Sequence, residues 1–200
     1  GEREEMDNSS FPMLYHDSEA KLASSIDWVA RGGVTPVKDQ GQCGSCWTFG
    51  AMAVVEAVNK VHTGSDTILA EQQLLDCSGK GSCSGGSTTS ALKWLTSHTP
   101  CLSSSYSYQA SDGHSCKSCH SSQIHVSKIN LLDKTDSALA HALGNSPVAV
   151  SLDGSQLKHY SSGVVQGTTG CHHSHSVLAV GYASGYWKIK NSWGKSWGEH

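Results

Sequence analysis

Hydrophobic periodicity divides the chain into a helical first half and a strand-rich second half. After Cys46, apolar residues recur every three or four positions, and Gly64 can end that helix. Shorter helices are predicted at 71–77, 87–98 and 136–143. After Pro147, apolar runs predict strands at 148–152, 176–180 and 186–190. Because the helices precede the strands instead of alternating with them, the pattern favours an α+β protein with two packed lobes.

The remaining segments show no such period. Residues 1 to about 24 are polar and acidic and read as a leftover N-terminal extension. Residues 99–122 are rich in Ser, Gly and Cys, which predicts an ordered loop tied by disulfides. The run 34–38 is predicted to be extended, because Pro36 disfavours a helix before it. Ser45 is predicted to cap the helix at Cys46 with its side-chain oxygen.

Composition and charge exclude several classes of partner. The 200 residues carry 14 basic and 17 acidic side chains, a net charge of -3, which is too little positive charge for electrostatic binding of nucleic acid. No stretch approaches the roughly 20 apolar residues of a membrane span. We therefore expect neither a nucleic-acid nor a membrane partner.

The eight cysteines leave two compartments open, an oxidising one with disulfides or the cytosol with bound zinc. Zinc would use Cys43-x-x-Cys46 with Cys116-x-x-Cys119, but the two pairs lie far beyond the roughly 15 to 20 residues that separate them in a compact zinc ribbon. The histidines of the run 171–175 are too crowded on an extended chain to share one tetrahedral ion. We expect no metal and no other cofactor.

The run from Gln40 to Trp47 carries the strongest chemical signal. Cys46 falls at a predicted helix N-terminus, where unpaired N–H groups and the helix dipole stabilise a thiolate. Such a nucleophile needs a proton donor for its leaving group, which calls for a histidine. His175 begins an apolar strand and Asn191 ends the next one, so two adjacent antiparallel strands would bring them together.

The run Cys43-Gly44-Ser45-Cys46-Trp47 resembles the signature of the papain-like cysteine protease family, which has its histidine and asparagine roughly 130 to 150 residues downstream. Further landmarks in family order are Asp27-Trp28, Val34-Thr35-Pro36-Val37-Lys38, Glu71-Gln72-Gln73-Leu74, Cys83-Ser84-Gly85-Gly86, Val180-Gly181-Tyr182 and Asn191-Ser192-Trp193-Gly194. The resemblance covers residues 24–200 and is closest to the cathepsin L-like branch.

The resemblance implies a papain-like two-lobe fold with the active-site cleft between the lobes. The helical lobe would span about 31–127, and the antiparallel, barrel-like β lobe about 128–200 together with the mature N-terminus. Residues 1–23 would then be a remnant of the pro-region. The chain would lack about the last 20 residues of the family domain, an estimate that fits ordinary domain sizes.

The same resemblance implies a cysteine endopeptidase that works through a covalent acyl-enzyme. Cys46 would be the nucleophile, and His175 an imidazolium at rest and then the general acid and base. Asn191 would hold the ring of His175, with Trp193 shielding that bond. The side-chain amide of Gln40 and the backbone N–H of Cys46 would form the oxyanion hole.

The implied substrate-binding residues are Gly85 and Gly86, which admit a substrate backbone, together with Trp193 and a set of small polar residues that includes Ser174. The pocket for the side chain two residues before the cut is usually apolar in the family, yet its matching positions here are Ser87, Thr88, Ser151, His173 and Ser176. We therefore expect a weakened preference for Leu or Phe. Ser174 stands where the family often has Asp, which would shift the pH profile.

The family pattern also implies disulfides Cys43–Cys83 and Cys77–Cys116. We expect Cys101 to pair with Cys119, and Cys171 to have its partner beyond this chain. Such bridges imply a lysosomal, vacuolar or secreted protein. We expect a monomer that acts on polypeptides and binds proteinaceous inhibitors. The alternative is a catalytically silent papain-like scaffold that acts as a binding protein, against which the four intact catalytic positions argue.

Overall fold

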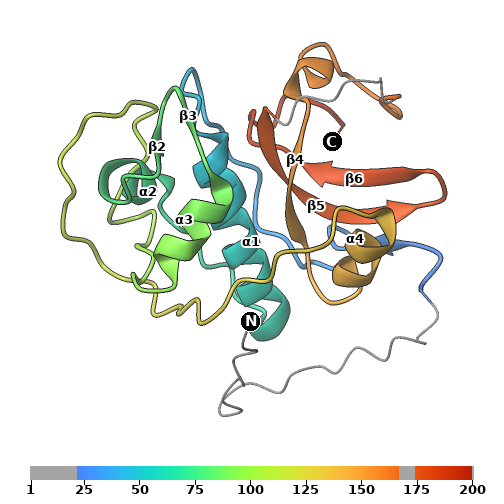
Figure 1. Ribbon diagram of the computed structural model, residues 1–200, viewed down its shortest axis with the longest axis horizontal. Coiled ribbons are helices and arrows are strands. Elements are labelled where there is room, and N and C mark those ends of the chain that lie inside the picture. Colours follow the sequence, from blue (N-terminus) through green and yellow to red (C-terminus); the bar gives the residue numbers. More distant parts are fainter. Residues whose placement is uncertain (1–21, 167–173, 200) are drawn as a thin grey trace, which may run out of the picture.

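The protein is described by a computed structural model that covers residues 22–166 and 174–199. Helices α1, α2 and α3 gather on one side, and the antiparallel sheet lies on the other together with α4 (Figure 1). The elements in chain order are β1 (Ile26–Asp27), α1 (Cys46–Thr63), α2 (Glu71–Cys77), β2 (Gly81–Ser82), β3 (Gly85–Gly86), α3 (Thr88–Leu95), α4 (Asp136–Leu143), β4 (Val148–Leu152), a short 3-10 turn (Gly154–Leu157), β5 (His175–Ala183) and β6 (Tyr186–Lys190). The sequence-based prediction of an α+β protein is confirmed.

Helix α1 is the central element of the fold. Its C-terminus is closed by Gly64, which adopts a left-handed conformation (φ 74°) and donates its N–H to the carbonyl of Lys60. One face of α1 packs against α2 and α3 in an apolar core that includes Trp47, Met52 and Leu74. Its opposite face packs against the sheet, where Ala57 meets Leu178 and Val180.

The sheet has four strands, and β5 lies at its centre. Strand β5 pairs with β1, β4 and β6, always antiparallel. In these registers Leu152 pairs with His175 and Leu178 with Lys190. Because β5 and β6 run in opposite directions, the first residue of β5 and the residue after β6 lie at the same end of this strand pair. The fold thereby places His175 beside Asn191.

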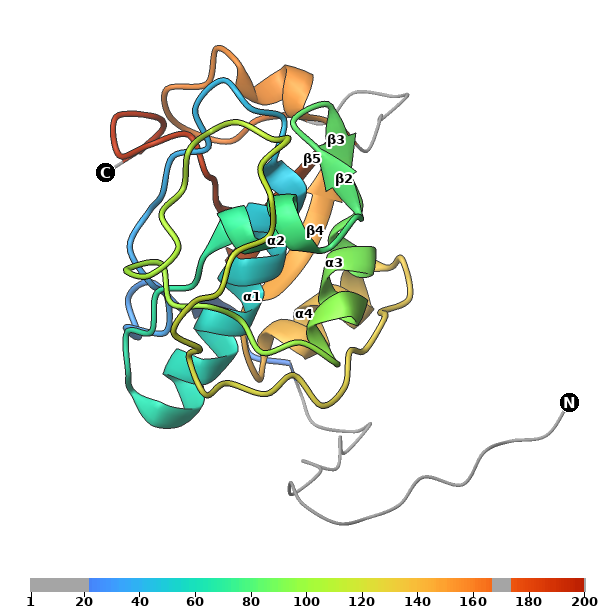
Figure 2. The same cartoon turned by 90° about the vertical axis from the view of Figure 1, so that its left-hand side faces the viewer.

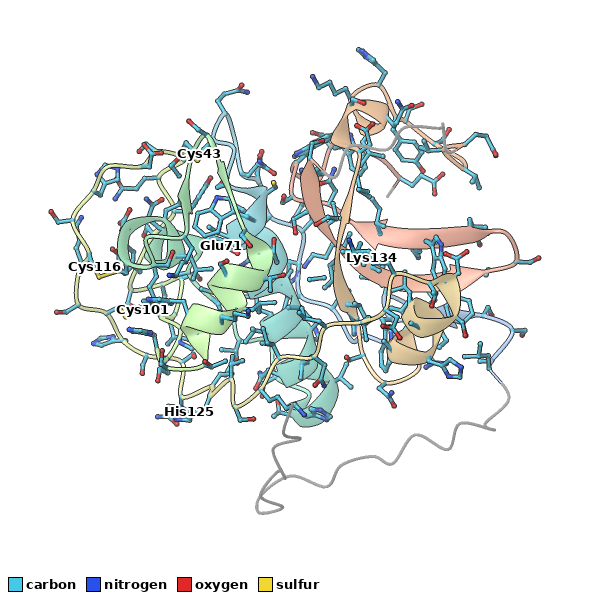
Figure 3. The ribbon with its side chains drawn as sticks, in the orientation of Figure 1. Cys43, Glu71, Cys101, Cys116, His125 and Lys134 are labelled. Carbon is cyan, nitrogen blue, oxygen red and sulfur yellow. A yellow bond between two sulfur atoms is a disulfide. The ribbon has the colours of Figure 1, made fainter. Side chains whose placement is uncertain are left out.

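A long segment joins α3 to α4 and runs over the outer side of α2 (Figures 1 and 2). The described residues contain three disulfides, Cys43–Cys83, Cys77–Cys116 and Cys101–Cys119. They join the same pairs that the sequence led us to expect. Figure 3 shows Cys101 and Cys116 in the helical half, away from the sheet. The Cys77–Cys116 bridge holds this long segment to the end of α2, and the Cys101–Cys119 bridge closes a loop within the segment.

Some sequence-based expectations need correction. The prediction that Ser45 caps α1 with its side chain is wrong, because its hydroxyl contacts Tyr108 Oη at 2.6 Å instead. Helix α3 ends at Leu95 and not at His98, since the side chains of Ser97 and His98 both bond to the carbonyl of Trp94. Ser87 caps this helix by accepting from the N–H of Ser90. The expected pro-region remnant lies almost wholly outside the described residues.

Among the helices that the structure describes, none has the length and apolar character needed to cross a lipid bilayer.

Candidate active site

Cys46 is the first residue of α1, and its position is fixed by the turn before it. It is partly exposed, and it is the only cysteine of the described residues outside a disulfide. The neighbouring Cys43–Cys83 bridge and the bond from the Gly44 N–H to the Cys83 carbonyl (2.7 Å) hold this turn. A side chain at Gly44 would collide with the Cys83 carbonyl. As the first helical residue, Cys46 has a backbone N–H without an intrahelical acceptor.

His175 and Asn191 form a buried hydrogen-bonded pair. Nε2 of His175 lies 2.7 Å from Oδ1 of Asn191, which also accepts the backbone N–H of Ser192 at 2.8 Å. The second bond fixes the orientation of the amide, because a flipped NH₂ group would face another donor. Nε2 is therefore the donor in the pair. The ring of Trp193 covers His175 with centroids 4.7 Å apart.

Burial lowers the pKa of His175, and the hydrogen bond that His175 donates to Asn191 opposes this effect without cancelling it. The pocket therefore favours the neutral imidazole unless a negative charge lies close by.

Gln40 is buried and held on both sides of its amide. Its Nε2 donates to the Cys43 carbonyl at 2.9 Å, and its Oε1 accepts the Ser192 hydroxyl at 2.8 Å. Its backbone N–H also donates to the Ser192 carbonyl at 2.9 Å. Ser192 thus ties Gln40, beside the Cys46 turn, to Asn191, the partner of His175. Sequence reasoning missed this role of Ser192, whose only signal was its place next to Asn191.

Tyr108 braces the turn from the other side. Its hydroxyl donates to the carbonyl of Gln40 at 2.8 Å and lies 2.6 Å from the hydroxyl of Ser45. Its ring meets Phe49 of α1 edge-on, with centroids 5.0 Å apart. Sequence reasoning missed this residue too, because it lies in the aperiodic loop and its partners are distant in sequence.

A pocket of about 240 Å³ opens beside Cys46 and His175. Its lining consists of Cys46, Trp47, Gly86, Ser87, Thr88, Thr89, Ser151, Ser174, His175 and Ser176. The structure thus brings together most of the residues expected to bind substrate with the expected nucleophile and base. Gly85 lies next to this lining with a positive φ of 124°, and a side chain at Gly86 would collide with the indole of Trp47. His173 lies outside the described residues.

A cluster of charged side chains lies between α1 and the sheet. Nζ of Lys38 lies 2.5 Å from both Glu56 Oε1 and Glu71 Oε1, and Glu56 is fully buried. Lys190 of β6 donates to the hydroxyl of Thr35 at 3.1 Å, and that hydroxyl donates to Glu56 at 2.6 Å. Burial raises the pKa of Glu71 to about 7 and lowers the pKa of Lys190 to about 8.

Most of the cysteines that a zinc site would need are bonded to other cysteines. Cys43, Cys116 and Cys119 are all in disulfides and so offer no thiolate to a metal. Within residues 22–166 and 174–199, no three side chains of the metal-binding types come together.

Comparison with known proteins agrees with this geometry. The sequence model of the papain family cysteine proteases matches residues 22–200. A KDEL-tailed cysteine endopeptidase from Arabidopsis thaliana is 38% identical over 199 residues, which are 94% of this chain and 55% of the relative. The chain thus spans about half the length of the curated relatives it matches.

Solved structures agree as well. A cysteine protease of Carica candamarcensis in complex with E-64 superposes with a TM-score of 0.80 at 36% identity, covering 89% of this chain and 86% of that one. The bromelain protease of Ananas comosus, also with this inhibitor, gives 0.77 at 34% identity with the same two coverages. The expected papain-like fold is confirmed, and the chain belongs to the papain family of cysteine proteases.

Proposed function

We propose that the protein is a cysteine endopeptidase that hydrolyses peptide bonds through a covalent acyl-enzyme. The observation that carries the proposal is one pocket lined by a free thiol at a helix N-terminus and by a histidine whose Nε2 is bound to an asparagine. Nucleophile, base and orienting group are the three parts that thiol catalysis requires.

In the proposed reaction the thiolate of Cys46 attacks the peptide carbonyl, and the new oxyanion accepts the backbone N–H of Cys46 and the amide of Gln40. One N–H of that amide is used by the Cys43 carbonyl, which leaves the second for the oxyanion. His175 protonates the leaving amine, and the C–N bond breaks to give a thioester on Cys46. His175 then takes a proton from water, which hydrolyses the thioester and restores the thiolate.

The resting state of the pair follows from two opposing influences on His175. Burial lowers its pKa, whereas a thiolate on Cys46 would favour the imidazolium. We propose that the dipole of α1 stabilises the thiolate of Cys46, and that this thiolate in turn keeps His175 protonated at rest.

We further propose that residues 24–200 form the peptidase domain, with a helical lobe at about 31–127 and a β lobe at about 128–200 that also takes in the N-terminal strand. Polypeptides would be the substrates of a monomeric enzyme, and proteinaceous inhibitors would bind the same cleft. The three disulfides suit an oxidising compartment. A relative that is named for a KDEL tail supports a vacuolar, lysosomal or secreted destination.

Titration with an epoxysuccinyl inhibitor tests the proposal, with Cys46→Ala as the control variant. We expect one inhibitor bound per protein at Cys46, with peptidase activity falling in proportion. A folded protein that neither binds the inhibitor nor cleaves any peptide would instead be the silent scaffold.

A further inference from the structure

The pocket beside Cys46 is lined by hydroxyl groups. The family resemblance implies that the matching pocket of relatives is usually apolar. Six of its ten described lining residues carry a hydroxyl: Ser87, Thr88, Thr89, Ser151, Ser174 and Ser176. Lys, Arg, Asp and Glu do not occur among these ten residues. The described lining is therefore polar, and apart from the proposed catalytic pair it includes no charged side chain.

These hydroxyls make some hydrogen bonds within the protein and keep further donor and acceptor capacity for a ligand. Thr88 donates to Ser176 Oγ at 2.8 Å. Ser87 Oγ accepts the N–H of Ser90 at 3.2 Å, and Ser174 Oγ accepts the N–H of Gly154 at 3.3 Å. A hydroxyl has one proton and two lone pairs. Within the described part of the chain, Ser87, Ser174 and Ser176 thus each retain one proton and one lone pair.

Ser176 is a buried part of the pocket wall. It is 6% exposed and belongs to the central strand β5. A side chain at Gly50 of α1 would collide with Ser176 Oγ, so only glycine at that position leaves room for the hydroxyl. With Gly50 behind it and Thr88 bonded to it, this hydroxyl is held as part of the pocket wall.

We propose that this pocket selects substrates with a primary carboxamide side chain, Gln or Asn, two residues before the cleaved bond. The inference rests on the proposed function. A carboxamide has a carbonyl that accepts the free protons and an NH₂ group that donates to the free lone pairs. Leu would cover the buried Ser176 hydroxyl without giving it a partner, which is costly. A carboxylate would bring a charge with no Lys or Arg among the described lining residues to pair with it.

A matched peptide series tests the proposal. The peptides differ only at that position and carry Asn, Leu, Gln or Glu; Asn and Leu have nearly the same shape. We expect kcat/KM to be at least about tenfold higher for Asn than for Leu, because a site built to hydrogen-bond its substrate discriminates against an analogue that lacks the group. Gln should also exceed Glu.

Two variants link the preference to the hydroxyls. Thr88→Val keeps the shape of the side chain, Ser176→Ala removes only one oxygen, and each should reduce the Asn-to-Leu ratio severalfold. Thr96→Val is the matched control, because Thr96 lies exposed at the other end of α3; its ratio should equal that of the wild type.

The outcomes separate the two proposals. Cleavage of all peptides with Leu or Glu preferred, or a preference for Asn that both variants leave unchanged, overturns the carboxamide inference while the peptidase function stands. Failure to cleave any peptide, together with failure of the epoxysuccinyl inhibitor to label Cys46, overturns the proposed function and the inference with it.

Discussion

Nε2 of His175 lies 2.7 Å from Oδ1 of Asn191, although the two residues are 16 positions apart. The antiparallel pairing of β5 with β6 sets this distance, and the N–H of Ser192 fixes the orientation of the amide. The ring of His175 is therefore held by the hairpin before any substrate arrives.

Replacing Asn191 by Ala should lower kcat by about ten- to a hundredfold with little change in KM, because a mobile imidazole transfers protons less effectively. Steady-state kinetics measure the effect. Ser184→Ala, in the exposed turn of the same hairpin, is the control and should retain the wild-type kcat. An Asn191→Ala protein with wild-type kcat would show that the orienting bond is dispensable.

Replacing Tyr108 by Phe should lower kcat more than it raises KM, because its hydroxyl holds both Gln40 and Ser45 beside Cys46, the proposed nucleophile. Tyr106→Phe is the matched control, since its hydroxyl donates to Asp76 at 2.8 Å instead. We expect each variant to lose about 1 kcal/mol of unfolding free energy. Equal kinetic effects of the two variants would contradict a positioning role for Tyr108.

Replacing Glu71 by Gln should flatten the pH dependence of stability between about pH 4.5 and 7. Burial raises the pKa of Glu71 from 4.5 to about 7, with Lys38 opposing. Because the pKa of Glu71 is higher in the folded state than in the unfolded state, protonation of Glu71 stabilises the fold at acid pH. This contribution to the free energy of unfolding is lost as the pH rises through 7. Urea unfolding at several pH values measures the difference in the free energy of unfolding between wild type and variant. Because both proteins contain His175, its titration cancels in this difference.

The control for this experiment is Asp133→Asn, a charge removal at an exposed position. Its pH dependence should parallel that of the wild type. A Glu71→Gln curve that also runs parallel to the wild type would show that Glu71 has no raised pKa.

Replacing both Cys101 and Cys119 by Ala should lower the free energy of unfolding by about 3 kcal/mol, the value for a loop of this size. The two cysteines are 18 positions apart, and Cys101 lies in the helical half, away from the sheet (Figure 3). We therefore expect kcat/KM at 25 °C to stay at the wild-type value. A loss of activity without a loss of stability would contradict this assignment of the bridge.

Much of the fold was predictable because its main elements carry local signals. Helices α2 and α4 and strands β4 and β6 have the bounds that periodicity and breaker residues predicted. The two-residue strands β1, β2 and β3 were not predicted, because a strand that short has no period to detect.

The candidate site was predictable as a set of residues but not as a network. The types and spacing of Cys46, His175 and Asn191 are visible in the sequence. The bonds that Ser192 and Tyr108 make to Gln40 span 152 and 68 positions, so only the fold reveals them. Tyr108 also explains the wrong prediction for Ser45. The Ser45 hydroxyl bonds to Tyr108, 63 positions away, instead of capping α1.

Mass spectrometry of the intact protein during turnover of an activated ester substrate shows whether Cys46 forms an acyl-enzyme. We predict a mass increase of one acyl group that maps to Cys46, decays as product appears, and is absent in Cys46→Ala. Turnover without any acyl group on Cys46, or an acyl group that persists in Cys46→Ala, would show that Cys46 is not the nucleophile.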